Sequence, residues 1–151
     1  MAYSHLPQFA SFISETTLTT AYLYKLAYMT SDGYVVVPAS GAGWTTGPKQ
    51  APIGVYYGGG GKTTSTQVEA VQIGIGGILK IKFSSDSTNV PGQFVCASSA
   101  GLATSPSTAN FIIGRLIALT TGAARNIGSV LWNPVAFKGP KLGDISSTAD
   151  T

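Results

Sequence analysis

The 151-residue chain has few charged residues, one cysteine and one histidine. Charged side chains make up 10% of it, against about 25% in ordinary soluble domains. A surface with so few charges is poorly protected against association, so we expect neighbouring molecules to cover much of it. The single cysteine, Cys96, excludes a disulfide within the chain, and its neighbours Val95 and Ala97 predict a buried position.

Groups suited to catalysis or metal binding are equally scarce. His5 lies in a polar segment without a nearby residue that could position it as a general base. No spacing of His, Cys, Asp and Glu is typical of a metal site, and no Gly-x-Ser-x-Gly motif is present. We therefore predict that the protein is not an enzyme, with no catalytic residue, no cofactor and no metal.

Two glycine-rich segments superficially suggest nucleotide binding. In Gly58–Thr63 a phosphate-binding loop would need glycine where Tyr56 stands, and a helix where strand-like residues follow. Gly74-Ile75-Gly76 lacks the third glycine of a dinucleotide fingerprint, because Leu79 occupies that position. We expect the first segment to be an exposed hairpin tip and the second a bulge or sharp bend.

The net charge is +3, and the nine basic residues are scattered. No cluster indicates nucleic-acid binding, and no apolar stretch reaches the ~18 residues of a membrane span. The first residues lack the pattern of a secretory signal. We expect a soluble product made in a reducing cytoplasm, with neither nucleic acid nor membrane as a partner.

Alternating apolar residues predict β-strands along most of the chain. Ile78–Phe83 alternates most clearly, with Leu79, Ile81 and Phe83 facing inward and two lysines facing outward. In residues 21–30 alternation favours a strand, and a helix is the competing interpretation. Further strands are expected at 34–37, 53–57, 66–75, 93–98, 102–104, 112–119 and 127–132, with a turn at Thr120–Gly122.

A pattern of glycines occurs twice. The Asp32-Gly33 turn is followed by Gly54, and the turn at Gly101 is followed by Gly114. Gly33 and Gly54 are 21 positions apart, Gly101 and Gly114 are 13 apart, and the difference of 8 is assigned to the Gly41–Pro48 loop. We interpret the pattern as two similar strand–turn–strand halves; coincidence in a glycine-rich chain is the alternative.

The predicted fold is all-β, a small β-barrel or β-sandwich with extended arms. We divide the chain into an N-terminal arm (1–20), a β domain (21–134) and a C-terminal tail or arm (135–151). The arm should be removable as far as residue 18 without unfolding the domain. Its apolar anchors and the aromatics beside glycine loops are the candidate partner contacts: Leu6, Phe9, Phe12, Ile13, Trp44, Tyr56 and Tyr57.

From Ala21 to Pro134, the order of segments resembles the small β-rich capsid decoration (cement) proteins of tailed bacteriophages. The segments are Ser31-Asp32-Gly33, Pro52-Ile53-Gly54, Val68-Glu69-Ala70-Val71, Lys80-Ile81-Lys82, the run from Pro91 to Gly101, and Ile112-Ile113-Gly114. The resemblance implies a homotrimer on the outer capsid surface of the virion, bridging neighbouring major capsid proteins. The alternative is a glycan-binding or fibre-associated β domain of a virion or cell surface, suggested by Trp44, Tyr56 and Tyr57.

Overall fold

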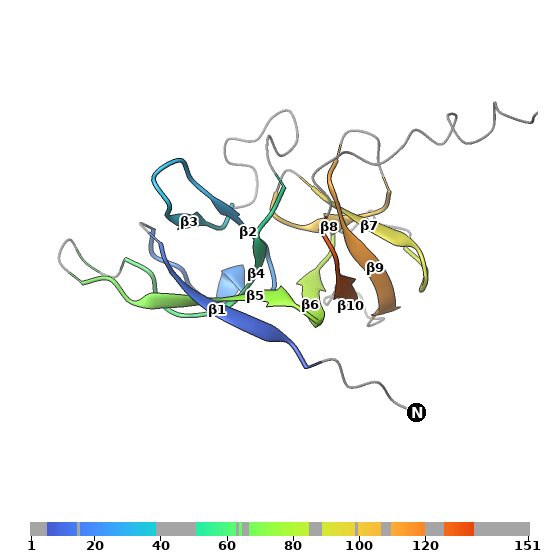
Figure 1. The fold of residues 1–151 in the computed structure, drawn as a ribbon, viewed down its shortest axis with the longest axis horizontal. Helices are drawn as coiled ribbons and strands as arrows, with labels where there is room; N and C mark the ends of the chain where they lie inside the picture. The colour runs from blue at the N-terminus through green and yellow to red at the C-terminus, as the bar shows by residue number, and fades with distance from the viewer. Residues whose placement is uncertain are drawn as a thin grey trace, which may run out of the picture.

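The chain folds into two five-stranded antiparallel sheets in a computed structural model, which confirms the all-β prediction (Figure 1). The structure describes residues 6–14, 16–38, 51–62, 64, 67–84, 89–98, 100–106, 110–119 and 126–134. The sheets are not closed into a barrel, so the sandwich is the correct form of the prediction. Trp44, the Gly41–Pro48 loop, the expected turn at Thr120–Gly122 and the predicted tail 135–151 lie outside the described residues.

The first half of the chain builds one sheet and the second half builds the other. The first sheet has the order β1-β5-β4-β2-β3, and its strands are β1 (Gln8–Ile13), β2 (Leu26–Met29), β3 (Val35–Val36), β4 (Gly54–Gly58) and β5 (Ala70–Gly76). The second has the order β6-β10-β9-β7-β8, and its strands are β6 (Ile78–Lys82), β7 (Phe94–Ala97), β8 (Ala103–Thr104), β9 (Ile112–Leu119) and β10 (Ile127–Trp132).

The two sheets have the same topology, so β1 to β5 correspond in order to β6 to β10. Their registers match as well. Gly54 of β4 pairs with Ala27 of β2, as Gly114 of β9 pairs with Val95 of β7. Both sheets also have an irregularity at the same place, where one residue of the fourth strand, Tyr57 or Ile117, is skipped in pairing with the fifth. The predicted internal repeat is thus confirmed, strand by strand.

The register also locates the length difference between the halves. Gly33 and Gly101 occupy equivalent turns 68 positions apart, with φ angles of 83° and 69°. Gly54 and Gly114 are 60 positions apart. The 8 extra residues of the first half therefore lie between β3 and β4, in the connection that contains the predicted Gly41–Pro48 loop.

The N-terminal segment is not a free arm in its described part. Gln8–Ile13 is β1, which pairs with β5 and corresponds to β6 of the second half. Leu18 is buried in the core of the first half. The β domain therefore begins at Gln8 rather than at residue 21. β1 lacks a clear apolar alternation because it is an edge strand, and its exposed positions tolerate residues such as Gln8 and Ser11.

Residues 21–30 also differ from the predicted strand. They contain the end of a 3₁₀ turn, η1 (Thr20–Tyr22), and the strand β2 begins only at Leu26. Tyr24 has a φ of 65°, a left-handed conformation that cannot continue a strand. The matching residue of the second half is Gly92, with a φ of 90°, so the backbone shape is repeated although the residue type is not.

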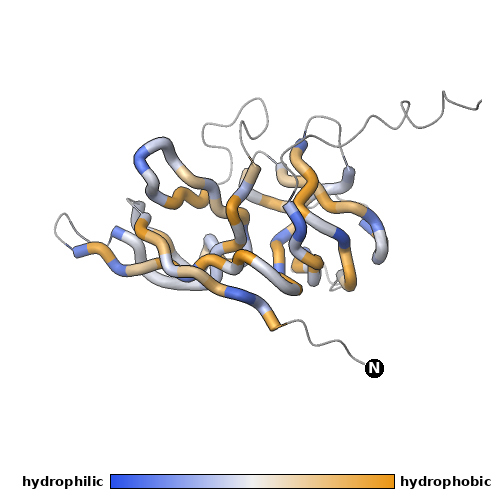
Figure 2. The backbone as a smooth tube through the Cα atoms, viewed as in Figure 1, coloured by the Kyte–Doolittle hydropathy of each residue, from blue (hydrophilic) through white to orange (hydrophobic). Residues whose placement is uncertain are grey.

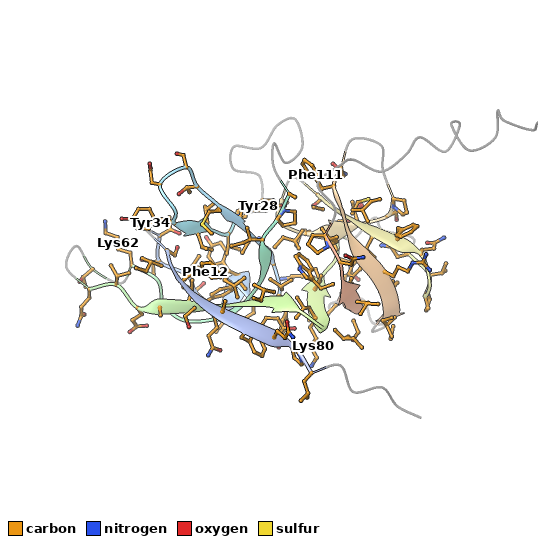
Figure 3. All side chains as sticks on the ribbon, in the orientation of Figure 1. Phe12, Tyr28, Tyr34, Lys62, Lys80 and Phe111 are labelled. Carbon is orange, nitrogen blue, oxygen red and sulfur yellow. The ribbon has the colours of Figure 1, made fainter. Side chains whose placement is uncertain are left out.

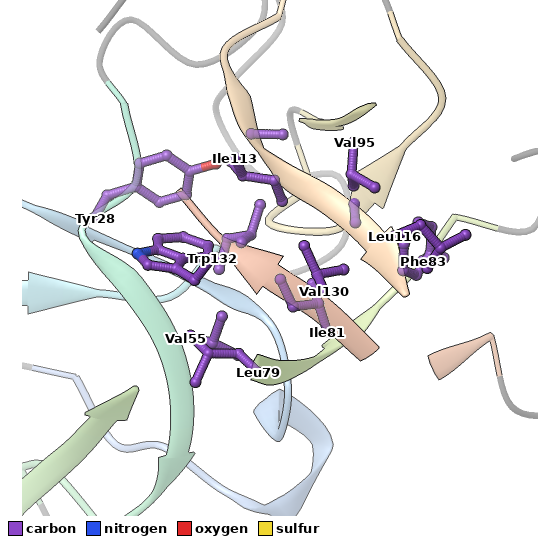
Figure 4. Packing of buried hydrophobic residues seen from close by; sticks show 13 residues of the cluster. Tyr28, Val55, Leu79, Ile81, Phe83, Val95, Ile113, Leu116, Val130 and Trp132 are labelled. Carbon is purple, nitrogen blue, oxygen red and sulfur yellow. The ribbon is translucent and has the colours of Figure 1, made fainter. Parts of the chain in front are cut away.

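The main core lies where the two sheets meet. Leu26, Tyr28 and Val55 of the first sheet pack against residues of the second that include Leu79 and Trp132 (Figure 4). Gly77, with a φ of 78°, makes the bend that carries the chain from β5 into β6. The predicted sharp bend is therefore the crossing between the two sheets.

A second core belongs to the first half alone. Val71 and Ile73 of β5 lie in it with Tyr56 and Leu18, and Phe12, labelled in Figure 3, packs on it from β1. The inward positions predicted for 78–83 are confirmed, since Leu79, Ile81 and Phe83 are buried and alternate with more exposed residues. Figure 2 shows the matching pattern of hydropathy, with a hydrophilic turn between β2 and β3.

Candidate partner-binding edge

Strand β1 forms an open edge of the first sheet. It pairs with β5 on one side, and no described strand lies along its other side (Figure 1). The outward-facing N–H and C=O groups of an edge strand are a template for pairing with another chain. The edge is therefore a place where an extended segment of a partner could add a strand.

The equivalent edge of the second half is already covered from within the molecule. On β6 the N–H of Lys80 donates to the Tyr57 hydroxyl at 2.6 Å, and the N–H of Lys82 donates to the carbonyl of Tyr24 at 2.8 Å. The matching residues of β1 are Ser11 and Ile13. No described segment runs along β1 in the same way, so the repeat has one covered edge and one open edge.

Exposed apolar side chains lie along the open edge. Leu6 is 77% exposed, Phe9 47% and Ile13 51%, so the structure brings three of the predicted anchors together on one strand and its approach. The fourth predicted anchor, Phe12, points to the opposite face and packs on the core of the first half. Phe12 is thus a structural residue, because successive side chains of a strand face opposite sides.

Three aromatic rings connect this edge to the junction between the halves. The ring centroids of Phe9 and Tyr57 are 5.0 Å apart, and those of Tyr57 and Tyr24 are 5.4 Å apart, both edge to face. Tyr57 also accepts the backbone hydrogen bond of Lys80. Such ring pairs contribute about 0.5–1.5 kcal/mol each, so Phe9 is held firmly although nearly half of it is exposed.

Tyr24 is held in a strained backbone conformation at this junction. It has the only positive φ of a non-glycine residue in the described part of the chain, which costs about 1–2 kcal/mol. Its ring contact with Tyr57 and the hydrogen bond from Lys82 to its carbonyl offset that cost. The second half has glycine at the equivalent position, Gly92, which has no side chain to make such a ring contact.

The remaining predicted contact residues are placed differently. Tyr56 is 2% exposed, and its hydroxyl donates to the carbonyl of Gly59 at 2.5 Å. The prediction that it contacts a partner is corrected, because its side chain points into the core of the first half.

Residues 58–62 are also not a free hairpin tip. The N–H of Leu18 donates to the Gly60 carbonyl, and Thr17 forms a β-bridge with Gly61.

The second sheet has an exposed face that was not predicted from the sequence. Phe94 is 47% exposed, Ile117 48% and Leu131 38%, and the Arg115 guanidinium lies 4.6 Å from the centre of the Phe94 ring. In the first half, the positions that match Phe94 and Arg115 are Leu26 and Val55, which are fully buried against the second half. A strand-by-strand alignment of the repeat could have found this face.

Burial raises the pKa of three tyrosines, Tyr28, Tyr56 and Tyr57. The unfolded chain loses these phenolic protons near the ordinary pKa of 10.0, whereas the folded protein loses them only at a higher pH. Above that pH the unfolded state binds fewer protons than the folded state. The contribution of these groups to the free energy of unfolding is therefore complete below pH 10 and is lost as the pH rises further.

We expect Tyr28, the most deeply buried of these tyrosines, to ionise only as the fold is lost at alkaline pH. Phenolate absorbance and far-ultraviolet circular dichroism, followed together against pH, check this. Tyr28→Phe should shift the unfolding midpoint to higher pH. Ionisation of all seven tyrosines with the circular dichroism unchanged would contradict the expectation.

Comparison with known proteins identifies no family for this chain. No family model matches the sequence, and neither the curated proteins nor the solved structures contain a match. Within the described residues, no group of three or more His, Cys, Asp or Glu side chains could hold a metal ion. The same part of the chain has no helix with the length and apolar character needed to cross a membrane.

Proposed function

We propose that the protein is a structural virion protein that binds the outer surface of an assembled phage capsid. It stabilises the lattice by bridging neighbouring major capsid proteins. The observation that carries the proposal is the edge of β1, where three apolar side chains are exposed and no described strand pairs along the outer side. The resemblance of the segment order to capsid decoration proteins supports the same function.

Attachment would occur by strand addition at β1. Main-chain hydrogen bonds to an extended capsid segment would supply affinity, and Leu6, Phe9 and Ile13 would supply apolar contacts. A homotrimer, which the resemblance implies, would present three such edges, and their joint attachment would be much stronger than one contact. Binding the assembled lattice but not its dissociated subunits stabilises the lattice by mass action, by about 2.7 kcal/mol per site at 100 times the dissociation constant.

Neither Tyr56 nor Tyr57 supports the glycan-binding alternative, and Trp44 lies outside the described residues. Tyr56 is buried, and the ring of Tyr57 is packed against Phe9 and Tyr24. Sugar stacking needs an accessible aromatic face, which these packed rings do not offer. The capsid remains the proposed partner.

Charged substitutions on the edge test the proposal. Leu6→Lys with Ile13→Lys should weaken attachment to capsids lacking the protein by at least about tenfold, since lysines on an edge strand oppose strand addition. Co-sedimentation of the purified protein with capsids measures the attachment. Thermal unfolding should change little, because both side chains are largely exposed.

A matched control is Val68→Lys, since Val68 is 51% exposed and lies outside β1. It adds one positive charge and removes one apolar side chain, as each of the two substitutions on the edge does. This variant should attach like the natural protein. Equal attachment of the double variant and the control would overturn the role assigned to the β1 edge.

A further inference from the structure

A cleft of about 600 Å³ lies at the junction between the two halves, and no residue of β1 lines it. Two of its lining residues are lysines, one from each half. Its walls combine hydroxyl groups, apolar groups and one aromatic ring. The lining residues are Thr17, Thr19, Ala21, Tyr22, Lys25, Lys82 and Leu102.

Lys25 is a buried cation with no acidic partner among the described residues. It is 8% exposed, its ammonium donates to the carbonyl of Pro38 at 3.3 Å, and it lies 5.5 Å from the centre of the Tyr22 ring. These contacts use only part of its capacity, since an ammonium has three donors. A buried charge is costly unless it is paired, so the site is incomplete as it stands.

Lys82 adds a second positive charge to the same cleft. Burial lowers the pKa of Lys25, and the charge of Lys82 lowers it further. The described part of the chain contains two acidic residues, Asp32 and Glu69, and neither lines the cleft. Glu69 instead accepts a hydrogen bond from the N–H of Gly60. The chain therefore places two cations together and, in its described part, supplies no anion to them.

We propose that this cleft binds a carboxylate carried by a partner protein, the side chain of an aspartate or glutamate. Two ammonium groups supply charge-assisted hydrogen bonds to such a group. The cleft is much larger than one carboxylate, and Tyr22, Ala21 and Leu102 provide an apolar wall for the peptide that carries it. The site is assigned independently of the capsid proposal.

Titration of the full-length isolated protein with short peptides tests the site. One probe is the blocked pentapeptide Ac-Ala-Ala-Glu-Ala-Ala-NH2, and its twin has glutamine in place of glutamate. We expect the glutamate peptide to shift the amide NMR signals of Thr17, Thr19 and Leu102 in a saturable manner. The glutamine twin should bind at least about tenfold more weakly, the loss expected for one charge-assisted contact.

Lysine variants show whether the glutamate peptide binds in the cleft. Lys82→Gln should weaken the glutamate peptide about tenfold, and Lys82→Arg should restore most of the binding because it keeps the charge. Lys80→Gln is the matched control, because Lys80 lies on the same strand, carries the same charge and does not line the cleft. It should bind the peptide like the natural protein.

Three outcomes would overturn the proposal. They are equal binding of the two peptides, equal losses in Lys80→Gln and Lys82→Gln, and saturation by inorganic phosphate at concentrations where the glutamate peptide does not bind. The last would identify a site for a small free anion. None of these measurements involves a capsid, and the edge residues Leu6 and Ile13 do not line the cleft, so this proposal and the capsid proposal can fail separately.

Discussion

Replacing Gly114 with alanine is expected to lower the free energy of unfolding by about 3 kcal/mol, the upper range for an overpacked core. A Cβ atom at this position would overlap with the carbonyl oxygen of Leu131 and lie 2.9 Å from Cγ1 of Val130. Leu131 belongs to the neighbouring strand β10, so relief of the overlap requires the two strands to separate. Chemical unfolding followed by circular dichroism measures the loss.

The repeat provides a second copy of the same test. A Cβ atom on Gly54 would overlap with the carbonyl of Gly74 and lie 2.5 Å from Cγ2 of Ile73, and these residues match Leu131 and Val130 in the register. Gly54→Ala should therefore lower the free energy of unfolding by a similar amount.

Gly33→Ala is the control for backbone conformation alone. Gly33 has a φ of 83° and no atom within 4 Å of an added Cβ, so the cost should be about 1–2 kcal/mol. If Gly114→Ala costs no more than Gly33→Ala, close approach of the strands is not the reason for the glycine.

Removing residues 1–18 is expected to unfold the first half, although the sequence pattern predicted a removable arm. The deletion takes away β1 and the buried Leu18, and it exposes Val71 and Ile73. Burial of each large apolar side chain contributes about 1.5–3 kcal/mol. We expect a loss of about 5 kcal/mol, comparable with the whole stability of many domains.

A shorter deletion, of residues 1–5, leaves every described contact in place. This variant should have the same free energy of unfolding as the full chain. Guanidinium unfolding followed by circular dichroism compares the two variants. A variant lacking residues 1–18 with unchanged stability would show that β1 is an attached arm after all. The capsid experiment therefore uses substitutions on β1 and avoids truncation.

The turns of the repeat could be predicted because their causes are local. Gly33 and Gly101 stand where the backbone has a positive φ, which glycine adopts without steric cost. β6, β9 and β10 alternate or run apolar over five to eight residues, and their bounds follow from that pattern. These features depend on residues within a few positions of one another.

The candidate site could be predicted only in part, because its main property is what lies beside a strand. Leu6, Phe9 and Ile13 are visible in the sequence as apolar residues in a polar segment. Their exposure depends on β1 being the last strand of its sheet, paired with residues more than 50 positions away. Tyr56 and Tyr57 are neighbours in the sequence, yet one is buried and one reaches the junction, because opposite faces of β4 meet different surroundings.

The sequence by itself determined an all-β chain built from two similar halves, since alternation and turn glycines are properties of short segments. Tertiary structure alone decided how the halves differ. The first half covers the edge of β6, whereas β1 stays open, and the junction brings Lys25 and Lys82 into one cleft. Equivalent residues thus have different neighbours, because packing one half against the other breaks the symmetry that the repeat established.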